Sequence, residues 1–185
     1  QFYGNNYTDF YVGSNGWIGF TSGQPTALSS VPIPDTGYVP RDCIMFSWQD
    51  LNPAAGGQVL YQTIGIAPNR KFVLTFDAVP YYSTTIPFTS QVVLYEGSNV
   101  IDNHITDKPL HTNPSVQGIH DLLGTSATVF SGRNATIWSA NQESIRYFPS
   151  GISWYDLNSG QMVGVGDTLL YAPNQSTSVA GVIID

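Results

Sequence analysis

The sequence predicts an all-β chain, a two-sheet antiparallel β-sandwich of jelly-roll-like type over residues 1–148 followed by a shorter β segment over residues 149–185. Three observations predict this class. The helix formers Glu and Lys are nearly absent, whereas Val, Ile, Thr, Tyr and Phe are abundant. Short apolar or alternating runs recur along the whole chain. Clusters of Gly, Pro, Asn and Ser, typical of turns, separate these runs.

The first 148 residues contain a series of runs that we interpret as strands. In Lys71–Val79, the side chains of Phe72, Leu74, Phe76 and Ala78 share one face, as expected of a strand with one buried side. The predicted strands are Tyr7–Val12, Gly16–Thr21, Cys43–Trp48, Gln58–Ile64, Lys71–Val79, Thr89–Glu96, Asn99–Ile105, Ser115–Ile119, Ala127–Phe130, Ala135–Trp138 and Glu143–Phe148.

The segment Thr21–Pro40 has no clear hydrophobic period and contains four prolines. Because aliphatic residues recur within it, we expect an ordered loop rather than a disordered one. Proline-rich segments suit the margins of sheets, where a missing backbone N–H is tolerated. The loop is therefore predicted to cover an edge or an end of the sandwich.

Ser150-Gly151 marks a predicted boundary, after which the chain changes character. Four short strands are predicted in the tail, and a complete sandwich of the immunoglobulin type needs about seven over roughly 100 residues. The tail is therefore predicted to be half a domain. Its strands are Ile152–Asp156, Gln161–Val165, Asp167–Tyr171 and Ser176–Ile184.

Composition excludes several classes of partner. Charged residues make up 10% of the chain and the net charge is −7, so binding to a phosphate backbone is not expected. No apolar run approaches the length of a membrane span, and no signal segment opens the chain, which suggests a mature, soluble form. Cys43 stands alone and is expected to be a buried small hydrophobic residue, without a disulfide.

Two groups of motifs resemble known families. Phe2-Tyr3-Gly4-Asn5-Asn6-Tyr7-Thr8 with Ser14-Asn15-Gly16-Trp17-Ile18-Gly19-Phe20 resembles the opening of β-sandwich modules in large secreted proteins of Bacteroidota, and is similar to the opening of nidogen-like extracellular domains. The resemblance continues through Phe46–Pro53, Gly56–Tyr61, Ala67–Val73 and Gln91–Glu96, and so covers roughly residues 1–148. The tail, with Trp154-Tyr155-Asp156 and Val163-Gly164-Val165-Gly166, resembles part of an immunoglobulin-like repeat in adhesins and gliding-associated proteins of the same bacteria.

These resemblances imply export, surface attachment and tandem repetition. We therefore predict a non-enzymatic structural or adhesive module of an extracellular, cell-surface or filament-forming bacterial protein, which assembles through the edges of its β-strands. Its expected partners are other copies of itself or adjacent domains of a longer chain. The alternative is a carbohydrate-binding module of a secreted protein. A hydrolase is a distant third, since no nucleophile elbow, catalytic triad or facing carboxylate pair is recognisable.

Glycosylation has four candidate positions. Asn6, Asn134 and Asn174 each open an Asn-x-Ser/Thr sequon, and Asp167-Thr168-Leu169 resembles a short O-glycosylation signal of Bacteroidota. Attached sugar would suit a surface with so few charges, because it could supply the solubility that charge normally provides.

Cofactors are not expected, and the possible ligand sites are weak. The three histidines lack metal-binding spacing and are expected in loops or on the surface. Asp50 is a weak candidate for Ca²⁺, with the alternative that its carboxylate organises the turn Asn52–Gly57. Trp17, Trp48, Trp138 and Trp154 are expected to be core residues. Tyr81 and Tyr82, which follow Pro80 in a predicted loop, are the one predicted surface pair of aromatic rings, suited to contact a sugar.

The end of the tail is the predicted assembly element. Half of a sandwich exposes an apolar face and unpaired strand edges, which tend to pair with whatever strand is nearest. We expect the apolar run there to insert into the open sheet of a neighbouring copy, giving a head-to-tail fibre. The rival account is that these strands fold back and enlarge the first sandwich. The residues of this run are Val179, Ala180, Val182, Ile183 and Ile184.

Overall fold

The computed structural model describes residues 1–185 except 26–27, 150, 166–177 and 185. The described residues form thirteen strands and no helix, so none of them provides a helix able to cross a membrane. The strands are β1 Tyr11–Gly13, β2 Trp17–Gly19, β3 Cys43–Trp48, β4 Gln58–Ile64, β5 Lys71–Pro80, β6 Pro87–Tyr95, β7 Ile101–Lys108, β8 Val116–His120, β9 Ala127–Val129, β10 Ala140–Tyr147, β11 Gly151–Asp156, β12 Met162–Val165 and β13 Val179–Ile184.

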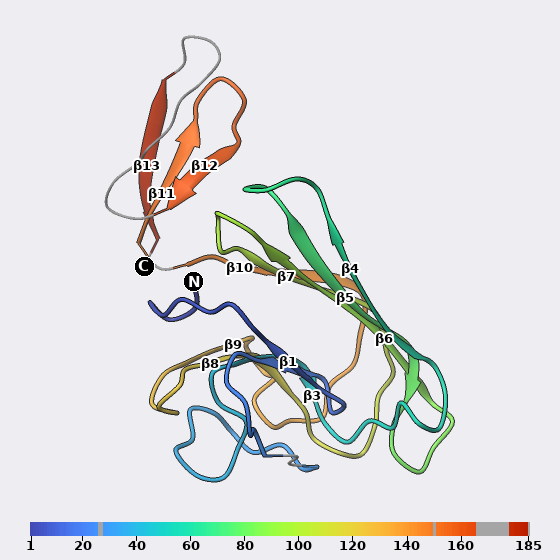
Figure 1. The fold of residues 1–185 in the computed structure, drawn as a ribbon. Helices are drawn as coiled ribbons and strands as arrows, with labels where there is room; N and C mark the ends of the chain where they lie inside the picture. Colours follow the sequence, from blue (N-terminus) through green and yellow to red (C-terminus); the bar gives the residue numbers. More distant parts are fainter. Residues whose placement is uncertain (26–27, 150, 166–177, 185) are drawn as a thin grey trace.

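Two antiparallel sheets of five strands face each other (Figure 1). The N-terminal sheet has the order β1-β2-β3-β8-β9, and the central sheet has the order β10-β7-β6-β5-β4. A third sheet, the tail sheet, has the order β12-β11-β13 and pairs with neither of the others among the described residues. The predicted all-β, two-sheet sandwich is therefore confirmed.

The main core fills the space between the two five-stranded sheets. Apolar side chains reach it from alternate positions, such as Ile44 and Phe46 on β3 and Leu74 and Phe76 on β5. The rings of Phe46 and Phe76 meet edge to face, with centroids 5.0 Å apart. Each sheet thus supplies one wall of a single apolar interior.

The loop Thr21–Pro40 covers the outer face of the N-terminal sheet, not an edge or an end as predicted. Strand β3 is buried on both faces, and its Cys43 and Met45 point away from the main core into a second cluster. Ile33 and Val39 of the loop are buried in that cluster. A sheet with two apolar faces needs a cover on each, and the loop provides the second.

A β-bulge corrects the predicted pattern of β5. The register shifts between Phe76 and Val79, so Ala78 takes a positive φ of 51° and is exposed, while Val79 enters the core. Two predicted strands also differ. Residues 7–10 precede β1 as irregular chain, and Ala135–Trp138 forms only an isolated bridge from Thr136 to Ser115.

Part of one flank of the sandwich is bridged by a chain of polar contacts, which the sequence analysis did not anticipate. On the flank of β9 and β10, buried Asn103 contacts both Ser90 and Gln117. Gln117 accepts a hydrogen bond from Arg133, which forms an ion pair with Glu143 on β10. These contacts link β6 and β7 to β8, and they link the segment that follows β9 to strand β10.

Candidate functional site

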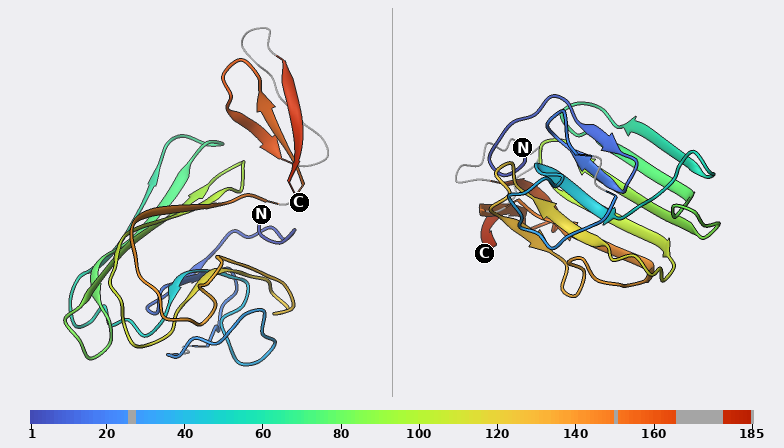
Figure 2. Two further views of the ribbon diagram at one scale, coloured as in Figure 1. Left: turned by 180° about the vertical axis from the view of Figure 1, so that it is seen from behind. Right: turned by 90° about the horizontal axis from the view of Figure 1, so that it is seen from below.

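The opposite flank, which we call the β1/β4 flank, presents exposed strand edges. Strands β1 and β4 are the edge strands there, and the view from below shows both along one side of the molecule (Figure 2). All seven residues of β4 are exposed, as are Tyr11 and Val12 of β1. The exposed large apolar side chains of the flank are Tyr11, Val12, Val59, Leu60, Tyr61 and Ile64.

Two cavities lie between the sheets, where the N-terminal segment runs between them (Figure 1). The first has a volume of about 470 Å³ and the second about 510 Å³. Gln1, Phe2, Asn99 and Ile101 line both, so the N-terminal segment separates two parts of one cleft.

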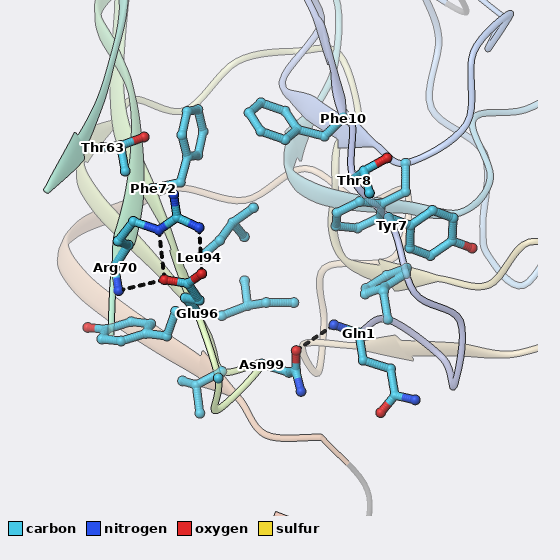
Figure 3. A pocket seen from close by; sticks show the side chains of 16 residues that line it. Gln1, Tyr7, Thr8, Phe10, Thr63, Arg70, Phe72, Leu94, Glu96 and Asn99 are labelled. Carbon is cyan, nitrogen blue, oxygen red and sulfur yellow. Dashed lines mark hydrogen bonds and ion pairs between the residues drawn. The ribbon is translucent and has the colours of Figure 1, made fainter. Parts of the chain in front are cut away.

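Aromatic rings form the inner wall of the first cavity (Figure 3). Phe10 packs against Phe72 of β5 with centroids 4.4 Å apart, and Tyr7 stacks on Phe20 at 5.1 Å. A tight turn in which Phe2 and Asn5 exchange backbone hydrogen bonds places the Phe2 ring in the main core. The predicted opening motif therefore builds this wall.

The rim of the first cavity is polar but carries little net charge. Arg70 donates from Nη2 to Glu96 Oε1 at 2.6 Å and from Nε to Oε2 at 2.8 Å (Figure 3). These hydrogen bonds lower the pKa of Glu96 to about 2. With Thr8, Thr63 and Asn99 nearby, the rim offers hydrogen-bonding groups around an apolar floor.

Behind the cleft, Tyr7 is held by a buried carboxylate. Its hydroxyl donates to Asp42 Oδ1 at 2.9 Å, and burial together with this carboxylate raises the pKa of Tyr7 to about 12. Asp42 is fully buried, and desolvation raises its own pKa. The tyrosine therefore anchors the N-terminal segment to the N-terminal sheet.

The prediction that Tyr81 and Tyr82 both lie at the surface is wrong for Tyr81. This ring is fully buried in the main core, and its hydroxyl donates to the Pro109 carbonyl at 3.0 Å. Leu51 bridges to Tyr81 in the isolated β-bridge that follows β5, so the chain is still extended where a loop was expected. Tyr82 alone is exposed, at 59%.

The tryptophans of the sandwich are core residues, as predicted. Trp17, Trp48 and Trp138 are all buried. Trp154 of β11 is only partly buried.

The glycosylation candidates differ in their surroundings. Asn6 is exposed ahead of β1. Asn134 is partly buried, and its side-chain amide makes two hydrogen bonds of 2.8 Å to the backbone of Ile33 in the covering loop. Asn174 and Thr168 lie outside the described residues.

The candidate metal ligands lie apart. Across the described parts of the chain, no three His, Cys, Asp or Glu side chains gather as a metal site. The Asp50 side chain is partly buried, which raises its pKa, while its carbonyl accepts a hydrogen bond from Tyr82 N. His120 is buried rather than at the surface, and its Nε2 accepts a hydrogen bond from Asp35 N of the covering loop.

The predicted assembly strand forms β13. It pairs with β11 of the same chain, from Val179 opposite Asp156 to Ile184 opposite Gly151. Of its apolar residues, Val179 is exposed and Ala180 is partly buried. Val182, Ile183 and Ile184 belong to the same ladder, and the predicted strand Asp167–Tyr171 lies outside the described residues.

Several residues of the cleft and flank were missed by the sequence analysis. The strand Gln58–Ile64 was predicted, but not its place at the edge of a sheet. The stretch from Leu51 to Asn69 has no charged residue, and this is a sequence signal for an edge strand that is not protected by charge. Phe10, Phe72 and the Arg70–Glu96 pair meet only through the tertiary fold, since they come from three separate elements.

Comparison with known proteins identifies the family. A family model described as NIDO related matches residues 1–155, which is most of the chain. No curated protein and no solved structure gives a significant match. The match confirms the resemblance to nidogen-like domains and reaches into β11, beyond the predicted boundary. The opening motif that lines the cleft lies within the matched residues, and the chain belongs to the NIDO-related family.

Proposed function

We propose that this chain is a structural or adhesive module of an extracellular surface protein or filament, and that it assembles through the edges of its sheets. The observation that carries the proposal is that two of its sheets end, within the described residues, in an uncharged edge strand of six or seven residues. These are β4 of the central sheet and β13 of the tail sheet. Such edges pair readily with further strands.

The family and the composition support an extracellular, non-enzymatic role. NIDO-related domains are typically extracellular, and the family is not a known enzyme family. The low charge and the exposed sequon at Asn6 suit a secreted glycoprotein. In the cleft, the two charged groups of the rim neutralise each other instead of facing an open site.

Deleting Thr177–Asp185 tests assembly through the tail. The deletion removes β13. If the full chain forms head-to-tail polymers, as we propose, electron microscopy should show none after the deletion, while circular dichroism should still report a folded β-sandwich. Wild-type protein at the same concentration is the control. Polymers of unchanged length after the deletion would contradict the role given to the tail.

Sugar binding is the second candidate, and the aromatic cleft with its polar rim is the observation that favours it. Rings such as Phe10 supply stacking surface, and Thr63 and Asn99 supply hydrogen-bonding groups. A glycan array with the purified chain tests it. Saturable binding that is lost on Phe10→Ala would place sugar in the cleft, whereas loss on Tyr82→Ala would place it at the exposed tyrosine. No binding to any glycan would remove this candidate.

A further inference from the structure

The four edges of the two five-stranded sheets differ in how they are protected against pairing. Strands β1 and β9 have only three residues each. Strand β10 carries Glu143 and Arg146, and Gln142 within it has a positive φ of 51°. Shortness, charge and irregular backbone are devices by which proteins prevent edge-to-edge association. Three of the four edges are therefore protected.

Strand β4 has none of these devices. It has seven residues and pairs with β5 in an unbroken register from Gln58 opposite Asp77 to Ile64 opposite Lys71. It contains no charged residue and no proline. Its outer edge is a regular row of backbone groups available for a further strand.

Both faces of β4 are apolar, which restricts what can pair with it. Val59 and Tyr61 lie on the face shared with Phe76 and Leu74, and they are 37% and 78% exposed. Leu60 and Ile64 lie on the opposite face and are 49% and 43% exposed. A partner strand with apolar residues on one face only would cover one face of β4 and leave the other exposed. A second copy of β4 has apolar residues on both faces and can cover both.

The charges on β5 favour a second copy in one orientation. Asp77 flanks one end of β4 and Lys71 flanks the other, both exposed and both on the face of Leu60. Antiparallel pairing of two β4 strands places the Asp77 end of each copy beside the Lys71 end of the other. Parallel pairing would instead bring like charges to the same end of the joined sheet, three inter-strand spacings or about 14 Å apart, so the charges add only a small preference for the antiparallel orientation.

We propose that β4 pairs with β4 of a second copy, antiparallel about a two-fold axis at Tyr61, and so joins two central sheets into one continuous sheet. The contact uses the same patch on both copies, as in the commonest closed dimers. The exposed Tyr11 and Val12 of β1 extend the apolar contact area on the same flank. The inference rests on the proposed function, in that it names one of the edges through which the chain assembles.

The chain carries a net charge of −7, which opposes association in general. The β4 strand itself adds no charge to that repulsion. Leu60 then lies opposite Gln62 of the second copy, and Val59 opposite Thr63, so each aliphatic side chain has a neighbour on its own face. The two Tyr61 side chains meet at the axis.

A charge-swap experiment tests both the edge and the register. Tyr61→Lys and Tyr61→Glu each place like charges opposite each other at the axis and remove the two aromatic rings that meet there. We expect each variant to associate roughly 100-fold more weakly than wild type in analytical ultracentrifugation. An equimolar mixture of the two should recover dimers. Tyr38→Lys is the matched control, because Tyr38 is 85% exposed in a loop away from the edge.

Cross-linking provides an independent readout. Cα atoms directly opposite in an antiparallel pair lie about 4.5–5.5 Å apart, within reach of a disulfide. Tyr61→Cys should therefore form a disulfide-linked dimer under mild oxidation. Wild type should not, since its one thiol, Cys43, is buried.

The outcomes separate this inference from the proposed function. Dimers that persist in both charged variants, or the absence of a Tyr61→Cys cross-link, overturn β4 pairing. If the charged variants behave like wild type while deletion of Thr177–Asp185 abolishes polymers, assembly through the tail stands and the β4 dimer falls. A wild-type chain that stays monomeric at millimolar concentration also overturns it.

Discussion

At the scale of single residues, two glycines near the start of the chain are explained by how closely other groups approach them. Gly16 has a positive φ of 76°, and its carbonyl accepts hydrogen bonds from Phe46 and Ser47 at the start of the irregular half of β3. A Cβ added at Gly16 would lie 2.4 Å from the Ser47 carbonyl oxygen. At Gly13, a Cβ would meet the Trp17 ring at 2.1 Å. These glycines thus permit contacts that no other residue allows.

Gly16→Ala is accordingly expected to destabilise the protein far more than a substitution that only strains the backbone. Gly23 is the matched control, because it has a similar φ of 72° and no atom within 4 Å of an added Cβ. We expect Gly23→Ala to cost about 1 kcal/mol and Gly16→Ala roughly 2 kcal/mol more. Urea denaturation of the two variants measures the difference. Equal costs would mean that the Ser47 contact is relieved by a small shift.

A second residue with a measurable signature is Lys108. It is 1% exposed, its Nζ donates to the Trp138 carbonyl at 2.9 Å, and it lies 4.1 Å from the centroid of that ring. Burial, with a smaller effect of nearby Arg133, lowers the pKa of Lys108 to about 7. Above that pH the folded chain has lost a proton that the unfolded chain retains up to about pH 10.4.

Stability should therefore rise with pH above pH 7, because the unfolded state binds more protons there. From pH 7 to pH 9 the free energy of unfolding is expected to gain roughly 2 kcal/mol relative to Lys108→Met, which has no group to titrate. Lys71→Met, at an exposed lysine, should keep the wild-type slope. Parallel slopes for wild type and Lys108→Met in chemical denaturation would refute the lowered pKa.

At the scale of elements, strands with strong local patterns could be predicted and those shaped by tertiary contacts could not. Cys43–Trp48 and Gln58–Ile64 match β3 and β4 at both ends. The bulge at Ala78 depends on the pairing of β5 with β6, which strict alternation does not encode. Tyr81 was misplaced because Pro80 suggested a loop, whereas the chain there remains extended and buried.

The covering loop is another element whose position depends on distant contacts. Asn134 holds it by pairing its amide with both backbone groups of Ile33, much as a neighbouring strand would. Asn134→Ala leaves the backbone groups of Ile33 without these partners, and we expect a loss of about 1–2 kcal/mol. Asn6→Ala, at an exposed sequon, should change the free energy of unfolding little. An equal decrease in Tm in both variants would argue against a stabilising role for the hydrogen bonds between Asn134 and Ile33.

The same contacts predict which sequon is used. Because Nδ2 of Asn134 donates to Ile33 O, a sugar there would have to displace the loop, whereas Asn6 is in solvent. In a host that glycosylates secreted proteins, peptide mass spectra should show glycan at Asn6 and an unmodified Asn134. Glycan at Asn134 in folded protein would show that the hydrogen bonds between Asn134 and Ile33 can break without unfolding the sandwich.

At the scale of the whole molecule, the sandwich is asymmetric. The polar chain that ends in the Arg133–Glu143 ion pair bridges part of the β9/β10 flank, whereas the β1/β4 flank presents exposed apolar side chains. Sequence patterns could predict two sheets and their polar and apolar faces. They could not predict which flank carries the polar chain, because Asn103, Gln117, Arg133 and Glu143 are ordinary polar residues until the fold brings them together.

The whole-molecule architecture also predicts that the sandwich folds without the tail. Both apolar clusters lie within residues 2–147, and the strands of the tail sheet pair only with one another among the described residues. Residues 1–149 alone should therefore unfold cooperatively, with a Tm within a few degrees of the full chain. The family match ends at Tyr155, so a second truncation at Asp156 is the informative comparison. If only the longer fragment folds, β11 belongs to the sandwich and the predicted boundary at residue 148 is wrong.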